Sequence, residues 1–289
     1  AVLVPHPIKV IMAIKKPIPI PIPVQEVEVI DRIYDAIEKK SRRKLRLSRL
    51  GASGIGDECI RRIWLSWRGY DTPTFNGRML RLFETGELQE KRIIADLRLA
   101  GFAVWDTYES GLQYAFTDDT EHFVVKLDGV VKGIPGAENT PHTLEVKTHN
   151  AKSFAELEKK SVQASKPAHY YQVQAGMLMT GIDRGFYVAL NKDNEQYYVR
   201  RIKPDDEVQS DILKRIKILT EAELAPAGIG GNQENYPCRW CDYKDVCYGN
   251  KPPLKTCRSC EHSKPFEKGS WLCTLKSSTL TLDDQMAAC

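Results

Sequence analysis

The spacing of apolar residues changes twice along the chain, and these changes limit the folds available to it. Helical spacing gives way near residue 102 to an alternating pattern typical of strands, and returns near residue 152. The predicted helices cover 26–41, a segment after Ser53 that carries "DECIRRIWLSWRG", 78–101, 153–165, 168–181 and 205–224. The predicted strands cover 103–110, 111–118, 122–133 and 142–149, followed by a hairpin of "GFYVALN" and "EQYYVRRI". This order predicts an α/β (α+β) fold with a central mixed sheet flanked by helices.

Size and composition are those of a soluble globular protein. Of 289 residues, 42% are hydrophobic and 28% are charged, and no stretch approaches the roughly 18 apolar residues of a membrane span. Residues 1–24 are apolar but broken by prolines and lack the features of a secretory signal, so we expect an extended segment there. Met12 would make a natural start, which leaves open whether residues 1–11 are native.

The positive charge is modest overall but locally concentrated. A net charge of +4 does not by itself indicate a nucleic-acid partner. The runs "KKSRRKLRLSR" (39–49) and "RRIWLSWR" (61–68) nevertheless cluster the basic residues. Each run is compatible with a solvated helix face or with contacts to a phosphate backbone.

Two carboxylates are expected to meet on neighbouring strands. If 122–133 and 142–149 form a hairpin centred between Gly136 and Ala137, Asp128 lies opposite Glu145. Directly opposed residues have Cβ atoms about 4.5–5.5 Å apart, where two like charges repel unless a cation lies between them. Lys147 lies on the same face as Glu145. Because Mg²⁺ and Mn²⁺ prefer oxygen ligands, this arrangement predicts a metal site.

Asp128 followed by Glu145-x-Lys147 resembles the PD-(D/E)XK nuclease superfamily, in particular its RecB-like branch. Upstream, Glu90 in "TGELQE" resembles the first acidic position of that family, and phage recombination exonucleases are similar there. Downstream, "HYYQVQAGMLMTG" resembles the helix that follows the catalytic strand and would supply Gln172 and, less directly, Tyr171. The resemblance implies a restriction-endonuclease-like core over residues 25–250.

The resemblance also implies roles for these residues. Asp128, Glu145 and the carbonyl of Val146 would hold Mg²⁺ or Mn²⁺, assisted by Glu90. Lys147 would orient or activate the attacking water, and Gln172 would position the DNA strand. We interpret the nearby residues His122, His149 and His169 as structural or surface residues.

The cysteines form two groups. "YPCRWCDYKDVC" contains Cys238-x2-Cys241-x5-Cys247, one thiolate short of a tetrahedral set. The iron–sulfur nucleases of the same branch, including CRISPR-associated and AddB-type enzymes, resemble this pattern and imply Cys59 as the fourth ligand of a [4Fe–4S] cluster. Zinc in the same four thiolates is the alternative.

The second group lies in residues 251–289, which we expect to form a small zinc-bound module. Cys257-x2-Cys260 has the spacing of a zinc knuckle, and Cys273 and Cys289 would complete the set. Unpaired reduced cysteines are the alternative. Such a module would contact DNA or a partner protein through the residues Arg258, His262, Lys264 and Trp271.

The resemblance implies a metal-dependent deoxyribonuclease in the cytoplasm of a bacterial, archaeal or phage-infected cell. We expect an exonuclease that hydrolyses phosphodiesters at DNA ends in recombination, repair or phage replication, with an oligomer or a recombination or replication partner left open. A structure-specific or restriction-like endonuclease is one alternative, and a catalytically idle DNA-binding scaffold is another. Trp64, Trp67 and Trp240 would either stack on bases or pack in the core.

Overall fold

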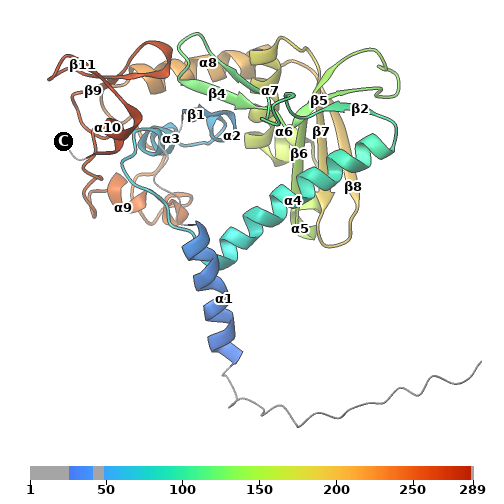
Figure 1. The fold of residues 1–289 in the computed structure, drawn as a ribbon, viewed down its shortest axis with the longest axis horizontal. Coiled ribbons are helices and arrows are strands. Elements are labelled where there is room, and N and C mark those ends of the chain that lie inside the picture. Colours follow the sequence, from blue (N-terminus) through green and yellow to red (C-terminus); the bar gives the residue numbers. More distant parts are fainter. Residues whose placement is uncertain (1–25, 42–48, 288–289) are drawn as a thin grey trace, which may run out of the picture.

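A five-stranded sheet in the order β2-β5-β6-β7-β8 forms the centre of the fold, seen on the right of Figure 1. β6 and β7 run parallel and the other neighbours pair antiparallel, so the sheet is mixed, as predicted. The strands are β2 (Ala103–Trp105), β5 (Gly129–Lys132), β6 (His142–His149), β7 (Gly185–Asn191) and β8 (Tyr197–Ile202). Helices cover both faces of the sheet, and β7 is buried along its whole length, as expected for a central strand.

This computed structural model describes residues 26–41 and 49–287. The proline-rich segment 1–24, most of the basic run 39–49 and Cys289 lie outside the described residues. None of the helices in the described part of the chain is both long and apolar enough to cross a bilayer.

Two groups of helices enclose the sheet because its residues alternate between two apolar faces. Ile93 and Ile94 of α4 pack on one face, against Leu144 and Val146 of β6. On the other face α5, α6 and α7 pack against β7 around Tyr187. These helices and their neighbour α8 are α4 (Gly77–Leu99), α5 (Ala151–Lys159), α6 (Val162–Ser165), α7 (Pro167–Thr180) and α8 (Asp206–Glu221). α1 (Glu26–Ser41) lies against the start of α4 (Figure 1). The two helices are so close at Gly77 that a Cβ atom on this residue would clash with the backbone of Tyr34.

The predicted strand over 122–133 is two strands in different sheets, so the prediction of one continuous strand is wrong. β4 (Phe123–Lys126) lies between β1 (Leu50–Gly51) and β3 (Ala115–Thr117) in a separate three-stranded sheet, whereas β5 joins the central sheet. The chain changes sheets at Leu127. The side chain of Leu127 is buried, and its backbone N–H donates to the carbonyl of Tyr114 at 3.0 Å. Asp128 therefore lies at a junction between two sheets rather than inside a ladder.

Other predicted elements are shorter or divided. The helix expected after Ser53 is two helices, α2 (Ala52–Ile55) and α3 (Ile60–Trp67). The helix expected over 153–165 is likewise α5 and α6, because Ser161 caps a new helix by accepting from the N–H of Ala164. The strands expected over 103–110 and 111–118 reduce to β2 and β3, which belong to different sheets.

The cysteine-rich tail contains several short helices and strands. Its elements are η1 (Cys238–Trp240), α9 (Lys244–Cys247), β9 (Ser263–Pro265), η2 (Glu267–Gly269), β10 (Trp271–Cys273), β11 (Ser278–Leu280) and α10 (Leu282–Met286). β9, β10 and β11 form an antiparallel sheet, coloured red in Figure 1, that packs beside α3. Trp271 is fully buried with its ring centroid 4.9 Å from that of Trp67, so the tail shares the core of the larger body.

Candidate active site

Asp128 directly precedes β5 and lies beside β6, the strand that carries Glu145. The observed pairs Gly129↔Leu144 and Val130↔Thr143 confirm the register predicted from the sequence. The ladder ends at Gly129, one residue short of the predicted pair of Asp128 with Glu145. On β6, Glu145 lies on the face opposite to that of its neighbours Leu144 and Val146.

The sheet change at Leu127 leaves Asp128 free to bind the edge of β6 through its side chain. Its Oδ2 accepts a hydrogen bond from the N–H of Val146 at 2.8 Å, in the place where a longer β5 would have supplied a backbone carbonyl. The N–H and C=O of one strand residue point to the same side of the strand. The carbonyl of Val146 therefore points toward Asp128, as a shared ligand position requires.

Glu145 and Lys147 form a buried ion pair. Their side chains are in contact through Oε1 and Nζ, and Glu145 is only 4% exposed. Burial, together with the neighbouring charge of Asp128, raises the pKa of Glu145 to about 8, although Lys147 opposes the shift. Burial disfavours the charged form of Lys147, but Glu145 and Asp128 outweigh this and raise its pKa.

Glu90 belongs to the same electrostatic cluster although it comes from α4. Burial, followed by the charge of Asp128, raises the pKa of Glu90 to about 7, and Lys147 opposes this shift. Burial also raises the pKa of Asp128. The structure thus brings Glu90, Asp128, Glu145 and Lys147 within electrostatic reach of one another, with three acidic groups around one ammonium.

The donor set of this cluster fits a hard divalent cation. Carboxylates with raised pKa values that come from three elements, together with a backbone carbonyl, are oxygen ligands of the kind that Mg²⁺ and Mn²⁺ accept. A cation there would also relieve the repulsion that raises these pKa values. Within residues 26–41 and 49–287, however, no group of three or more Asp, Glu, His or Cys side chains is already arranged to hold a metal ion. Glu145 is engaged by Lys147 and Asp128 by Val146, so ligation would require the carboxylates to reorient.

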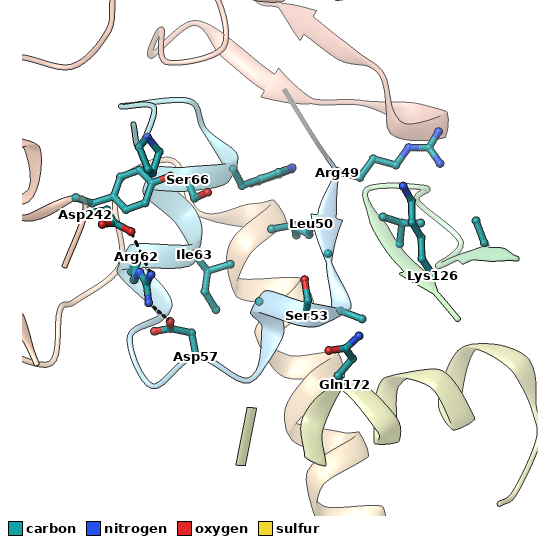
Figure 2. A pocket seen from close by; sticks show the side chains of 18 of the residues that line it. Arg49, Leu50, Ser53, Asp57, Arg62, Ile63, Ser66, Lys126, Gln172 and Asp242 are labelled. Atoms are coloured by element: carbon teal, nitrogen blue, oxygen red, sulfur yellow. Dashed lines mark hydrogen bonds and ion pairs between the residues drawn. The ribbon is translucent and has the colours of Figure 1, made fainter. Parts of the chain in front are cut away.

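A cavity of about 920 Å³ lies beside β4, the strand that leads to Asp128 (Figure 2). Of the described site residues predicted from the sequence, Gln172 lines it, pointing from α7 toward Ser53. Arg49 and Lys126 also line it and give one side a positive charge. Arg49 belongs to the basic run 39–49 named from the sequence, whereas Ser53 and Lys126 were not predicted as site residues. The available signal for Lys126 was its position two residues before Asp128 in the sequence.

Several residues named from the sequence lie elsewhere. The Tyr171 hydroxyl donates to Asp211 at 2.8 Å and so does not point toward Asp128 or Glu145. His149 and His169 both contact the buried Tyr187 hydroxyl, at 3.0 and 2.9 Å, which agrees with their structural interpretation. His122 contacts the carbonyl of Phe266 at 2.8 Å.

Four thiols line a second cavity, of about 180 Å³, at the opposite end of α3 from the tail sheet. They are Cys59, Cys238, Cys241 and Cys247. Cys59 is the N-cap of α3, and the other three belong to or directly follow η1 and α9. The structure therefore brings together the four cysteines that the resemblance implied, from segments far apart in the chain.

The surroundings of these thiols suit a negatively charged centre. Arg61 and Arg62 line the cavity, and Arg62 also forms ion pairs with Asp57 at 2.6 Å and Asp242 at 3.6 Å. The Tyr248 hydroxyl donates to Cys238 Sγ at 3.4 Å. Gly230 lies so close to the same sulfur that a Cβ atom there would approach it to 2.3 Å.

Several residues expected at a surface are buried. Trp64 and Trp67 pack in the core, the second of the two alternatives left open by the sequence, so neither is available to stack on bases. Arg258 and Trp271 are buried as well and do not form a binding surface of the tail, whereas His262 and Lys264 are exposed. Arg68, expected in a basic surface run, is only 4% exposed.

Comparison with known proteins gives a distant likeness in fold. No protein-family model and no curated protein matches the chain. Among solved structures, a complex of LHK-Exo with dAMP overlaps 60% of this chain and 87% of its own, with 21% identity and a TM-score of 0.44. The alkaline exonuclease LHK-Exo from Laribacter hongkongensis overlaps 60% and 89%, with 19% identity and a TM-score of 0.41. SSO0001 overlaps 76% and 96%, with 12% identity and a TM-score of 0.45. At these scores the likeness is confined to parts of the backbone, and the case for function rests on the site residues.

Proposed function

We propose that the protein is a Mg²⁺- or Mn²⁺-dependent deoxyribonuclease that hydrolyses phosphodiesters at DNA ends. The observation that supports this proposal is the place of Asp128, which is bonded to the N–H of Val146 beside the ion pair of Glu145 and Lys147. A sheet has nothing to gain from two neighbouring buried carboxylates unless a cation joins them. Recombination, repair and phage replication are the processes in which such an activity on DNA ends is used.

The roles follow from the chemistry of each group. Asp128, Glu145 and the Val146 carbonyl would hold the metal, with Glu90 assisting. A bound Mg²⁺ or Mn²⁺ polarises a phosphoryl oxygen and lowers the pKa of water. The water oxygen bonds to phosphorus, one bridging P–O bond breaks, and the leaving oxygen takes up a proton. Lys147 is positioned to orient the attacking water and to stabilise the negative charge that develops on the phosphate.

The cavity beside β4 supplies a path for the DNA strand. Arg49 and Lys126 offer positive charge to phosphates, and Gln172 with Ser53 offers hydrogen bonds. Contacts of this kind bind without sequence preference and weaken as salt rises. We therefore expect binding of DNA to be salt-sensitive and to depend on Lys126, which is exposed on the strand that leads to the carboxylates.

We propose further that Cys59, Cys238, Cys241 and Cys247 hold a [4Fe–4S] cluster with a structural role. Four thiols around one cavity and the neighbouring arginines support a dianionic cluster, and zinc is the competing occupant. Protein purified without oxygen should be brown, absorb near 400 nm and contain iron. A colourless protein that contains zinc alone would assign the site to zinc.

The activity is tested with end-labelled linear DNA and closed circular DNA, each single- and double-stranded, in the presence of Mn²⁺. The proposal predicts degradation of linear DNA, no cleavage of circles, and loss of activity in Lys147→Ala. The matched control is Lys152→Ala, which removes an exposed lysine on α5 and should leave activity unchanged. Cleavage of circles would identify an endonuclease, and DNA binding without cleavage would identify a scaffold protein. Full activity in Lys147→Ala would contradict the proposed mechanism.

A further inference from the structure

Tyr187 lies beside the carboxylate cluster on the neighbouring strand. In the parallel ladder of β6 and β7, Glu145 pairs with Tyr187 and Lys147 pairs with Ala189. Paired residues, and residues two positions apart on one strand, share a face of the sheet, so Tyr187 lies on the face of Glu145 and Lys147. Burial and then the charge of Glu145 raise the pKa of Tyr187. The phenol is therefore within electrostatic reach of the cluster.

Two imidazoles hold the buried Tyr187 hydroxyl. His149 Nε2, from β6, lies 3.0 Å from the hydroxyl oxygen, and His169 Nδ1, from α7, lies 2.9 Å from it. The other ring nitrogen of His149, Nδ1, lies 3.0 Å from Ser153 Oγ of α5. One chain of hydrogen bonds thus runs from Ser153 through His149 and Tyr187 to His169 and connects four elements of the fold.

The second ring nitrogen of His169 is the open end of this chain. Among the described residues, His169 is bonded through Nδ1 and has no hydrogen-bond partner at Nε2. His169 is half-buried, and Nε2 is not one of the buried polar atoms that lack a partner, so this nitrogen reaches solvent. Gln172, three positions later on the same face of α7, lines the large cavity. His169 therefore lies one helical turn from the path proposed for the DNA strand.

Both imidazoles are neutral in this environment. Burial, followed by the charge of Lys147, lowers the pKa of His169 to about 3, and His149 and Lys166 add to the shift. Burial, followed by the charges of Lys166 and Lys147, lowers the pKa of His149 to about 4. A neutral imidazole carries one N–H donor and one acceptor nitrogen. The contacts of each ring therefore decide which nitrogen of His169 holds the proton.

The direction of the chain determines what His169 offers to a ligand. The Tyr187 hydroxyl has one proton and can donate to only one of the two imidazoles. When it donates to His169 Nδ1, the proton of His169 is on Nε2. His149 Nε2 then donates to the Tyr187 oxygen, and Ser153 donates to His149 Nδ1. An ionised phosphate accepts hydrogen bonds and cannot donate, so a bound DNA strand selects this direction.

We propose that His169 donates from Nε2 to a non-bridging oxygen of the DNA phosphate that Lys147 contacts, and that Tyr187 and His149 are positioning residues that hold this tautomer. The inference rests on the proposed nuclease function, because it takes DNA as the ligand. A neutral donor complements the ammonium of Lys147. It stabilises negative charge on the phosphate without adding another cation to a site that is proposed to bind a metal ion.

Two amide substitutions separate the two nitrogens of His169. The shorter amide of His169→Asn can replace Nδ1 and keep the contact with Tyr187, whereas the longer amide of His169→Gln can replace Nε2. With Mn²⁺ and end-labelled linear DNA, kcat should fall about 10- to 100-fold in His169→Asn, the range for one hydrogen bond to a charged group. His169→Gln should retain more activity. Full activity in His169→Asn, or a larger loss in His169→Gln, would overturn the proposal and leave His169 a support of Tyr187 alone.

A second test uses the unaltered chain and needs no hydrolysis. With ¹⁵N-labelled imidazoles and Ca²⁺ in place of Mn²⁺, NMR should show the Nε2–H tautomer of His169. A short single-stranded DNA should shift this nitrogen more than either nitrogen of His149, and the spectrum of His169→Asn assigns the signals. These shifts without DNA degradation in Mn²⁺ would contradict the nuclease proposal alone. Degradation with an unshifted Nε2 would contradict the role of His169 alone, and absence of DNA binding would contradict both.

Discussion

The carboxylate cluster and the cysteine cavity are held together in opposite ways. Glu145 and Lys147 belong to β6, and Asp128 directly precedes β5, the strand that pairs with it, so the backbone of the sheet sets their positions. In contrast, Cys59 and the group from Cys238 to Cys247 come from opposite ends of the main body and meet only through tertiary packing. The first site is fixed by the sheet before any ligand binds, whereas the second gains most from a ligand that closes the long loop between its parts.

The two sites also differ in the charge that surrounds them. Acidic groups crowd one another at the sheet, so burial and mutual repulsion raise the pKa values of Glu90 and Glu145. At the cysteine cavity, Arg61 and Arg62 lie beside the thiols. A cation would therefore balance the charge of the sheet site, whereas the arginines would balance the charge of the proposed metal–thiolate centre. Metal removal should abolish activity at the first site, and its largest cost in stability should come from the second.

The largest expected effect is the loss of activity in Asp128→Asn. Asparagine keeps an oxygen that can accept from the N–H of Val146 but removes the charge that a cation requires. We expect hydrolysis to fall by about 10²–10³-fold, the range seen when one electrostatic group of an active site is removed. The free energy of unfolding of the metal-free protein should change little, because a buried carboxylate near like charges is replaced by a neutral group. Turnover on linear DNA measures the activity, and urea unfolding measures the free energy of unfolding. If the free energy of unfolding falls by as much as the activation free energy of hydrolysis rises, the effect on activity is not separate from the effect on stability.

The cysteine cavity should show the reverse pattern in Cys238→Ser. Loss of one ligand opens the connection between residue 59 and residues 238–247, and cross-links of long loops contribute about 2–4 kcal/mol. We expect the metal-loaded protein to lose stability by this amount. The matched control is the same pair of proteins after chelation, where the substitution should cost little. A cost that survives chelation would show that the thiol packs in the core without a ligand.

The sequence predicted the register of the sheet site because the turn and the alternating strands specify it locally. The pairing of Gly129 with Leu144 confirms the predicted register, although the ladder stops one residue before Asp128. The break at Leu127 could not be predicted in the same way. Its side chain continues the apolar alternation of 122–133, and the chain changes sheets only because β1 and β3 offer a second set of partners to β4.

The burial of the run "RRIWLSWR" could not be predicted from the run itself. Its arginines and tryptophans are equally compatible with a basic surface. In the structure Arg68 donates to two carbonyls of the tail, almost two hundred residues later in the chain. The cavity residues Ser53 and Lys126 were missed for a similar reason, because they come from α2 and β4, two segments far apart in the chain.

The pH dependence of stability sharpens the comparison. In the metal-free protein the pKa values of Glu145 and Glu90 are raised to about 8 and about 7, above the ordinary value of 4.5. The folded state therefore binds more protons than the unfolded state between about pH 4.5 and about pH 8, so its stability should fall as pH rises through this window. Mg²⁺ should remove this fall, and Glu145→Gln should reduce it. Urea unfolding near pH 5 and near pH 8.5 measures it, and stability that rises with pH in the metal-free protein would show that the carboxylates are solvated.

The smallest expected effect concerns Asp57, which connects the cysteine cavity to the large one. Its Oδ1 accepts from the N–H of Cys59 at 2.9 Å, its Oδ2 pairs with Arg62 at 2.6 Å, and it lines the large cavity. Asp57→Ala removes both contacts at the start of α3, so we expect a loss of about 1 kcal/mol of stability and faster release of metal from the thiols. Asp245→Ala, an exposed change on the neighbouring α9, is the matched control and should alter neither quantity. If Asp57→Ala lowers stability but leaves the rate of metal release unchanged, the contact with Cys59 stabilises the start of α3 and has no effect on the thiols.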